Sequence, residues 1–416
     1  MSDVTAEPRN VPNSFALSVK FKVGLAAVLC LTASGVGMLL DSGASYRKNV
    51  ALVEQQSLQF ARTTFDNLIA ADTGKLSVAT ELLMSNREVR EAFAAKDRPK
   101  LLALTAPILE RLKPVYGITN FNFLDEKEIR FLCVQEPENP KLMGTKAVRF
   151  NVQESARTKD WSTGLSLGFS GFALRATHPL WDNGRIQGDK LMGYLELGSE
   201  IGGFIKTMKN LSGNEYGLLI RKQALKPEMW GDQRKKNGLH DNWNDLPNLV
   251  VGTNTWKDEA IFAYAGDVSS LPDQGIAIDE ISGEGKIFAR GVFPIKDASG
   301  TKVGGVFVLT DITQIKEQFS ASKQRTIATT VGLTLVICLV ILFLLSRLVF
   351  RRLAAITQVA TRLVGGDYRT PAVVHKNDEI GRFEALFEQL RLIFVNLIED
   401  YECLASKPGK DQSTSE

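Results

Sequence analysis

The sequence is poor in the residue types that build metal sites and catalytic centres. Its 416 residues include only four cysteines and three histidines, and these have no metal-site spacing. No glycine-rich phosphate loop is recognisable, and neither a Ser/His/Asp set nor a pair of acids is spaced for catalysis. We therefore expect a protein that is not an enzyme and that holds neither a metal nor another cofactor.

An excess of charge of one sign is also lacking. Fifty Lys and Arg residues against 47 Asp and Glu residues leave a formal net charge of +3. The densest basic cluster, residues 234–236, is typical of a solvated loop. Because no basic run is interleaved with aromatic residues, we expect no nucleic-acid partner.

Two long apolar runs are present, at residues 23–40 and 327–346. Both are long enough to cross a bilayer as helices. For the first run, a cleaved signal peptide is the alternative, since the small residues 42–44 form a passable cleavage site. The helical pattern that continues beyond Asp41 favours a membrane span, so we expect a two-pass protein in contact with the lipid bilayer.

Basic residues beside the two runs predict the orientation. Lys20 and Lys22 precede the first run, and the second is followed by Arg347, Arg351, Arg352 and Arg362. Positive charge is enriched on the cytoplasmic side of a membrane. We therefore expect a protein of the bacterial inner membrane with both termini cytoplasmic, residues 1–22 inside and residues 41–326 outside.

The segment after the second run, residues 347–400, has the pattern of two amphipathic helices. The first has apolar residues spaced three and four apart and ends at the pair Gly365–Gly366. The second starts near residues 377–379, and its apolar residues are Ile380, Phe383, Phe387, Leu390, Phe394 and Leu397. This heptad spacing predicts a parallel four-helix bundle made by two chains, and hence a homodimer.

The same segment resembles the HAMP linker family. The resemblance rests on Gly366–Asp367–Tyr368 after the first helix and on Asp378–Glu379–Ile380–Gly381 at the start of the second. Members usually carry a proline after the membrane helix, where this chain has Arg351 and Arg352. The resemblance implies a signal relay, for which we name Leu353, Ile356, Asp378, Glu379, Ile380, Phe383 and Phe387. The alternative is an ordinary amphipathic hairpin or membrane-surface helix, and residues 401–416 read as a polar tail.

The outer region begins with a helical pattern and continues with a repeat. Apolar spacing predicts a helix over residues 51–83, with a weak point at Gly74. Residues 175–197 and 290–309 then share a strand, an Asp/Gly turn and a returning strand. A repeat about 115 residues apart predicts two similar α/β units in tandem.

This order of elements resembles the double-Cache sensory family, whose units are PAS-like antiparallel sheets. The resemblance implies an α+β fold with a long membrane-proximal helix, tandem PAS-like units, two transmembrane helices and a cytoplasmic HAMP bundle. The distal unit would span about residues 117–200 and the proximal unit about 213–312. Residues 116–123 are similar to one subgroup with two strand histidines, but Asn120 and Leu124 occupy those positions. That subgroup's ligand therefore cannot be transferred.

If the resemblance holds, the distal unit binds a small molecule. Arg175 lies among apolar residues on a predicted strand, and a buried Arg requires an anionic partner. Glu196 on the returning strand is the internal candidate, and a bound carboxylate is the other. Asn122, Arg130 and Trp161 are further candidates for ligand contact, with a structural or surface role as the alternative.

These observations predict a sensor subunit that binds an extracytoplasmic small molecule and passes a conformational change through the relay. Since no kinase, cyclase or chemoreceptor signalling domain follows residue 400 in this sequence, we expect output through a separate cytoplasmic signalling protein. Two alternatives stay open. One is an accessory membrane subunit whose outer domain binds another protein, and the other is a receptor that has lost its output domain.

Overall fold

The computed structural model describes the chain except residues 1–18, 169–170, 183–189, 372, 374–378 and 406–416. The described chain divides into two compact units. One contains residues 44–319, and the other contains residues 1–43 and 320–416.

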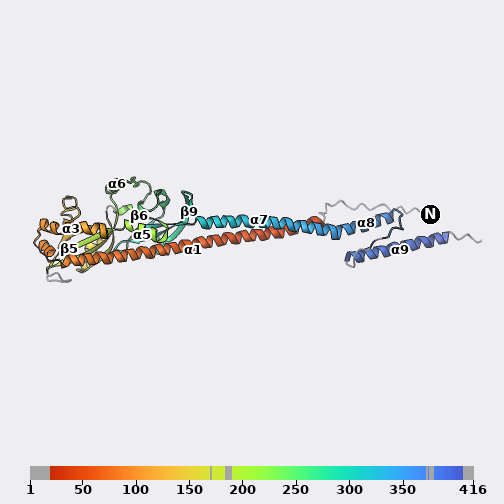
Figure 1. Ribbon diagram of the computed structural model, residues 1–416, viewed down its shortest axis with the longest axis horizontal. Coiled ribbons are helices and arrows are strands. Elements are labelled where there is room, and N and C mark those ends of the chain that lie inside the picture. The colour runs from red at the N-terminus through yellow and green to blue at the C-terminus, as the bar shows by residue number, and fades with distance from the viewer. Residues whose placement is uncertain (1–18, 169–170, 183–189, 372, 374–378, 406–416) are drawn as a thin grey trace, which may run out of the picture. The chain divides into compact units, whose positions relative to one another are not determined.

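A single long helix, α1 (Val19–Ser85), begins the described chain (Figure 1). The predicted helix over residues 51–83 is confirmed. The weak point expected at Gly74 is wrong, because α1 continues through it without a break. The free-energy cost of one glycine inside a helix is small compared with the gain from tertiary packing. Here packing buries a helical stripe of Leu58, Ala61, Phe65, Leu76 and Leu83.

The first of two sheets in the unit of residues 44–319 has five antiparallel strands in the order β2-β1-β5-β4-β3. Its strands are β1 (Ile118–Asp125), β2 (Arg130–Cys133), β3 (Ser162–Gly168), β4 (Gly171–Trp181) and β5 (Leu191–Glu200). The helices that accompany it are α2 (Arg87–Ala94), α3 (Arg98–Tyr116) and α4 (Phe150–Thr158). Gly117 ends α3 in the left-handed conformation at φ +68°, which glycine adopts without strain.

The second sheet repeats the first in topology, with the order β7-β6-β10-β9-β8. Its strands are β6 (Glu215–Arg221), β7 (Leu249–Asn254), β8 (Ile276–Gly283), β9 (Lys286–Lys296) and β10 (Lys302–Asp311). Its helices are α5 (Gly202–Ser212) and α6 (Pro227–Lys236), with short 3-10 turns η1 (Lys222–Ala224), η2 (Glu259–Phe262) and η3 (Val268–Ser270).

The predicted repeat is therefore present as two similar sheets. Its first copy contains the pair β4 and β5 and its second the pair β9 and β10, each paired antiparallel. The α+β class with two antiparallel sheets is confirmed. The main apolar core lies between the sheets and α1, with Phe65 edge-on to both Phe204 and Phe293.

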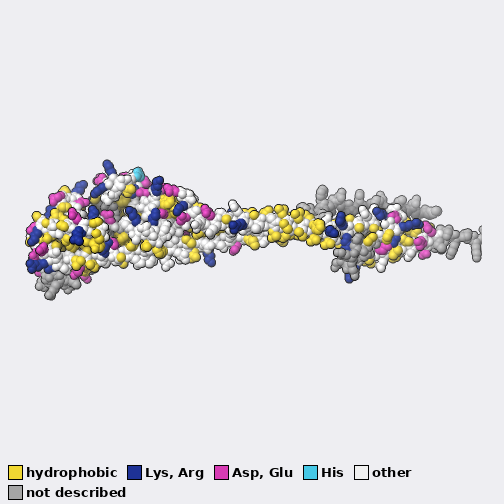
Figure 2. Space-filling model, viewed as in Figure 1, with side chains coloured by type: hydrophobic (Ala, Val, Ile, Leu, Met, Phe, Trp, Pro, Cys, Tyr) yellow, Lys and Arg dark blue, Asp and Glu magenta, His cyan; other side chains and the backbone are white. Residues whose placement is uncertain are grey.

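The other unit consists of helices. It contains the beginning of α1 and most of α7 (Thr313–Leu344), followed by the π-helical turn η4 (Leu345–Phe350), α8 (Arg351–Val364) and α9 (Glu379–Ala405). By length and composition, α1 and α7 contain segments that can cross a membrane. Figure 2 shows their hydrophobic side chains exposed on the surface. As predicted, α8 ends before Gly365. The predicted cap at residues 377–378 lies outside the described residues.

Candidate ligand-binding site

The two faces of the first sheet have different coverings. Leu174 and Ala176 of β4 belong to the main core with the helices. Tyr194 of β5 instead packs with Val152 of α4. Because side chains alternate along a strand, Arg175 lies on the α4 face, together with the other odd residues of β4 and the even residues of β5.

Glu196 is the centre of this α4 face, and its side chain is 0% exposed. Its Oε1 accepts hydrogen bonds from Arg175 Nη1 at 3.0 Å, from Asn122 Nδ2 at 3.1 Å and from Arg149 Nη2 at 2.5 Å. Its Oε2 accepts a further bond from Arg149 Nε at 3.1 Å. The internal pair of Arg175 and Glu196 that the sequence suggested is therefore present, within a larger network.

A third guanidinium, that of Arg130, completes an excess of positive charge. Its Nη1 donates to Leu142 O and to Thr145 Oγ1, both at 3.0 Å. Burial lowers the pKa of Arg130, and the nearby charge of Arg149 lowers it further, while Glu196 opposes both. Two guanidinium groups thus bind one buried carboxylate and a third lies near it, which leaves the α4 face positive.

The pKa values of Glu196 and Arg175 reflect this excess of positive charge. Burial raises the pKa of Glu196, but the charges of Arg149 and Arg175 outweigh burial and hold the pKa below its ordinary value. Burial lowers the pKa of Arg175, and the attraction of Glu196 only partly offsets that effect. Glu196 is therefore ionised at neutral pH and fully engaged with its partners.

Several buried polar atoms on or beside the α4 face have no hydrogen-bond partner within the described part of the chain. They are both amide atoms of Asn151, the hydroxyl of Thr177 and Nε of Arg130. Asn151 lies on α4, which contacts β3 and β4, and Thr177 lies opposite Glu196 in the strand register. Buried polar groups in folded proteins are normally hydrogen-bonded to protein or water. A polar guest beneath α4 is therefore chemically favoured.

The structure brings together most of the site residues that the sequence suggested. Asn122, Arg130, Arg175 and Glu196 belong to one network. Trp161 does not join it. Its ring contacts the His178 ring at a centroid distance of 4.2 Å and packs against the helix-side core. Whether any of these residues contacts a ligand stays a prediction.

Sequence reasoning missed Arg149 and Asn151. Arg149 is the residue before α4 and holds Glu196 with two hydrogen bonds, and Asn151 is fully buried on the same helix. Both lie in a stretch without strand or long helical periodicity. The only available signal was a pair of polar residues flanking Phe150 next to a short amphipathic pattern.

The proposed relay residues lie on α8 and α9. Ile356 is buried, and the rings of Phe383 and Phe387 lie 6.0 Å apart. Arg352 of α8 and Glu384 of α9 form an ion pair at 2.9 Å with Glu384 1% exposed. Leu353, Glu379 and Ile380 lie on the same two helices. Asp378 falls outside the described residues.

Comparison with known proteins gives one family match. Residues 54–240 match the family model dCache_3, described as a double sensory domain of two-component sensor kinases. No curated protein matches the chain.

Similar solved structures are sensory domains at low identity. The sensor domain of the Vibrio cholerae histidine kinase DctB is 13% identical and covers 64% of this chain and 98% of its own, with a TM-score of 0.37. The periplasmic domain of Vibrio cholerae LuxQ is 13% identical, with coverages of 62% and 98% and a TM-score of 0.35. The ligand-binding domain of the Campylobacter jejuni chemoreceptor Tlp3, solved with 4-methylisoleucine, is 10% identical, with coverages of 65% and 94% and a TM-score of 0.37.

All three TM-scores are below 0.5. The family match stands independently of them, and it runs from α1 through the whole first sheet to α6 of the second. Over residues 54–240, the chain therefore matches the double-Cache family of sensory domains.

Proposed function

We propose that the chain is a transmembrane sensor subunit that binds a small anionic molecule beneath α4 on the outer side of a bacterial inner membrane. Binding shifts the outer domain between two packings. The change passes through α7 to a HAMP-type relay at residues 347–400 and then to a separate cytoplasmic signalling protein.

The observation that carries this proposal is the excess of buried positive charge around Glu196. Three guanidinium groups face one carboxylate, and unpartnered polar atoms of Asn151 and Thr177 lie on the adjoining elements. A buried charge without compensation is costly. A carboxylate ligand compensates the charge and accepts hydrogen bonds from guanidinium forks.

The direct connection of the sheets to long helices supports the relay. Strand β10 ends at Asp311, and α7 begins at Thr313. In the other direction, α1 is one helix of 67 residues. A change at the sheets therefore reaches the apolar helices without an intervening loop, and a coupling of about 1–3 kcal/mol is typical for such switches.

Exposed apolar residues on α9 support a parallel homodimer. Phe383 is 49%, Leu390 47% and Phe394 45% exposed in the single chain, although they form one heptad stripe. A stripe of this kind is buried in a coiled coil or four-helix bundle. A second copy of the chain is the partner we assign to it.

A thermal-shift screen tests the proposal. The full chain in lipid nanodiscs is heated with organic acids, amines, amino acids or neutral aromatic compounds. A ligand at 100 times its dissociation constant stabilises the fold by about 2.7 kcal/mol. We expect shifts with carboxylates that are lost in Arg149→Met and kept in Arg157→Met. The control Arg157 lies on α4 but pairs at the surface with Glu154.

A flat response from a sample that melts cooperatively would overturn the proposal. It would favour an accessory subunit whose outer domain binds another protein.

A further inference from the structure

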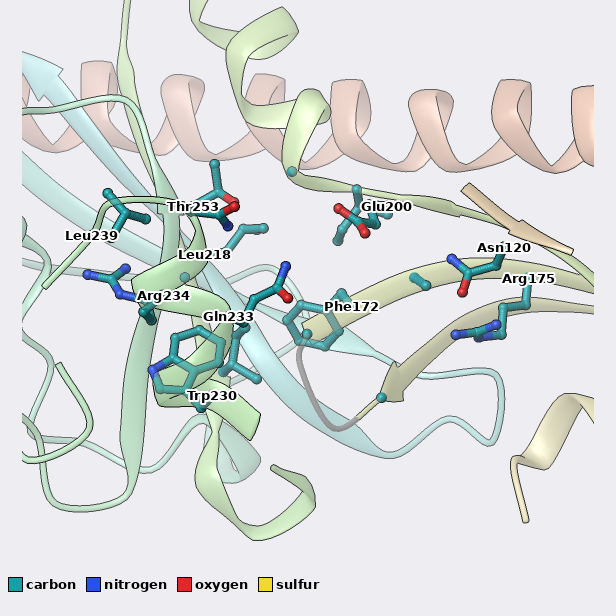
Figure 3. Close-up of a pocket in the computed structure, with 18 residues that line it drawn as sticks. Asn120, Phe172, Arg175, Glu200, Leu218, Trp230, Gln233, Arg234, Leu239 and Thr253 are labelled. Atoms are coloured by element: carbon teal, nitrogen blue, oxygen red, sulfur yellow. The ribbon is translucent and has the colours of Figure 1, made fainter. Parts of the chain in front are cut away.

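A second cavity lies between the two sheets, beside the network around Glu196. Its volume is about 190 Å³, and residues of β1, β4 and β5 of the first sheet face residues of β6, β7 and α6 of the second (Figure 3). Of the network around Glu196, only Arg175 also lines this cavity. A volume of this size corresponds to about six water molecules in the liquid, which suits a small polar compound.

Gly198 brings two polar side chains of the first-sheet wall close together. In the strand register Gly198 lies opposite Asn120 on one side and Arg175 on the other. A Cβ atom at Gly198 would lie 3.2 Å from Asn120 Cβ and 3.3 Å from Arg175 Cγ. The absence of a side chain therefore lets the stems of Asn120 and Arg175 approach each other. Both of these polar groups border the cavity.

Charges of opposite sign lie at this wall without pairing with each other. Arg175 uses Nε for Ser166 and Nη1 for Glu196, while its Nη2 makes no hydrogen bond within the described part of the chain. Glu200 lies two residues beyond Gly198 on the same face of β5 and makes no ion pair with any described residue. Diagonal neighbours on a sheet are about 7–8 Å apart, which leaves room for a small molecule to bridge the two side chains.

The second-sheet wall supplies neutral polar groups and apolar surface. Gln233 extends from α6 toward the cavity, and Thr253 comes from β7 (Figure 3). Arg234 also borders it, but both oxygens of Glu259 accept hydrogen bonds from its Nη2, at 3.0 and 2.9 Å. That guanidinium is therefore compensated. The charges that can meet a guest are those of Arg175 and Glu200.

We propose that this cavity is a second ligand site, which takes a small zwitterion. The carboxylate of the guest meets Arg175 Nη2, and its ammonium group meets Glu200. Gln233 and Thr253 contact it from the other sheet. Because the walls come from both sheets, the guest favours the arrangement in which the sheets approach most closely. The chain then carries two inputs that share Arg175.

The test measures binding of a homologous series to the full chain in lipid nanodiscs by isothermal titration calorimetry. The series is glycine, 3-aminopropanoate, 4-aminobutanoate and 5-aminopentanoate, with butanoate and butylamine as singly charged comparisons. We expect at least one zwitterion to bind at least tenfold more tightly than both comparisons. Glu200→Gln should weaken that binding at least tenfold, and Gln233→Phe, which fills the cavity, should abolish it.

Two controls show whether an effect is specific to the cavity. Glu228→Gln removes an exposed acid of α6 that does not line the cavity, and it should leave the affinity within twofold. Arg157→Met should also leave it within twofold, because Arg157 pairs with Glu154 at the surface and does not line the cavity. The proposal is overturned if no zwitterion binds, if butanoate binds equally well, or if Glu200→Gln and Gln233→Phe leave binding unchanged.

Discussion

Arg149 donates two hydrogen bonds to Glu196, at 2.5 and 3.1 Å, although Arg175 already pairs with the same carboxylate at 3.0 Å. The two arginines come from elements far apart in sequence, the residue before α4 and the middle of β4. Glu196 therefore ties α4 to the sheet. On the proposed function, a ligand that competes with Glu196 for either guanidinium weakens this connection between α4 and the sheet.

Replacing Glu196 with Gln should strongly destabilise the outer domain. The change leaves the guanidiniums of Arg149 and Arg175 without their anionic partner. Removal of one partner from a buried ion network costs about 3–5 kcal/mol. Thermal unfolding followed by circular dichroism measures the loss. Glu154→Gln, which alters an exposed pair on α4, is the control and should leave the melting temperature unchanged. Equal melting of the two variants would contradict the network.

Glu54 should make stability depend on pH. Burial raises the pKa of Glu54 to about 7, with help from Glu280 and Asp279 and against a backbone hydrogen bond from Ile278. Since the folded chain holds this proton more tightly than the unfolded chain, its contribution is complete below the ordinary value of 4.5. It is lost as pH rises to about 7.

Glu54→Gln should remove that contribution. Relative to the wild-type chain, the variant should gain stability between pH 4.5 and 7 and show no further gain above that range. Melting temperatures across this range provide the measurement. Glu81→Gln, at an exposed position of α1, should follow the wild-type profile. Parallel profiles for wild type and Glu54→Gln would show that Glu54 does not retain its proton.

Gly35 should be intolerant of large side chains. A Cβ atom there would lie 2.5 Å from Thr330 Cγ2, so the apolar parts of α1 and α7 approach closely at this point. Gly35→Leu should cost about 1–3 kcal/mol by overpacking. Gly37→Leu is a matched control, because nothing lies within 4 Å of its Cβ position. Thermal unfolding in nanodiscs compares the two variants, and equal effects would refute the helix contact.

Leu390→Glu should weaken the proposed homodimer. Leu390 is 47% exposed and belongs to the α9 stripe with Phe383 and Phe394. A charge in a dimer interface is desolvated without a partner. Leu392, two residues on, is 46% exposed but points to another side of the helix, so Leu392→Glu is the control. Light scattering after size-exclusion chromatography should show monomers for Leu390→Glu and dimers for the wild-type chain and Leu392→Glu.

Local sequence pattern predicted the elements whose periodicity is strong. The long helix, the paired strands of the repeat and the helix end before Gly365 all appear where expected. The weak point predicted at Gly74 does not interrupt the helix, since packing of the flanking stripe outweighs the low helix propensity of one glycine.

The site was predictable only in part. Arg175 and Glu196 could be paired because both lie on strands of one hairpin with a readable alternation. The position of Trp161 outside the network could not be read from local pattern, because the register of Ser162 with Thr177, which sets its face, depends on pairing between distant residues. Arg149 and Asn151 reach the sheet only through the folding of α4 over it, which no local pattern encodes.

The most direct measurement is a calorimetric titration of the carboxylate that gives the largest thermal shift. It is titrated into the wild-type chain, Arg149→Met and Arg157→Met in nanodiscs. We predict one saturable binding event in the wild type and in Arg157→Met, and at least a tenfold weaker event in Arg149→Met. Equal affinity in all three proteins would contradict an anion site beneath α4.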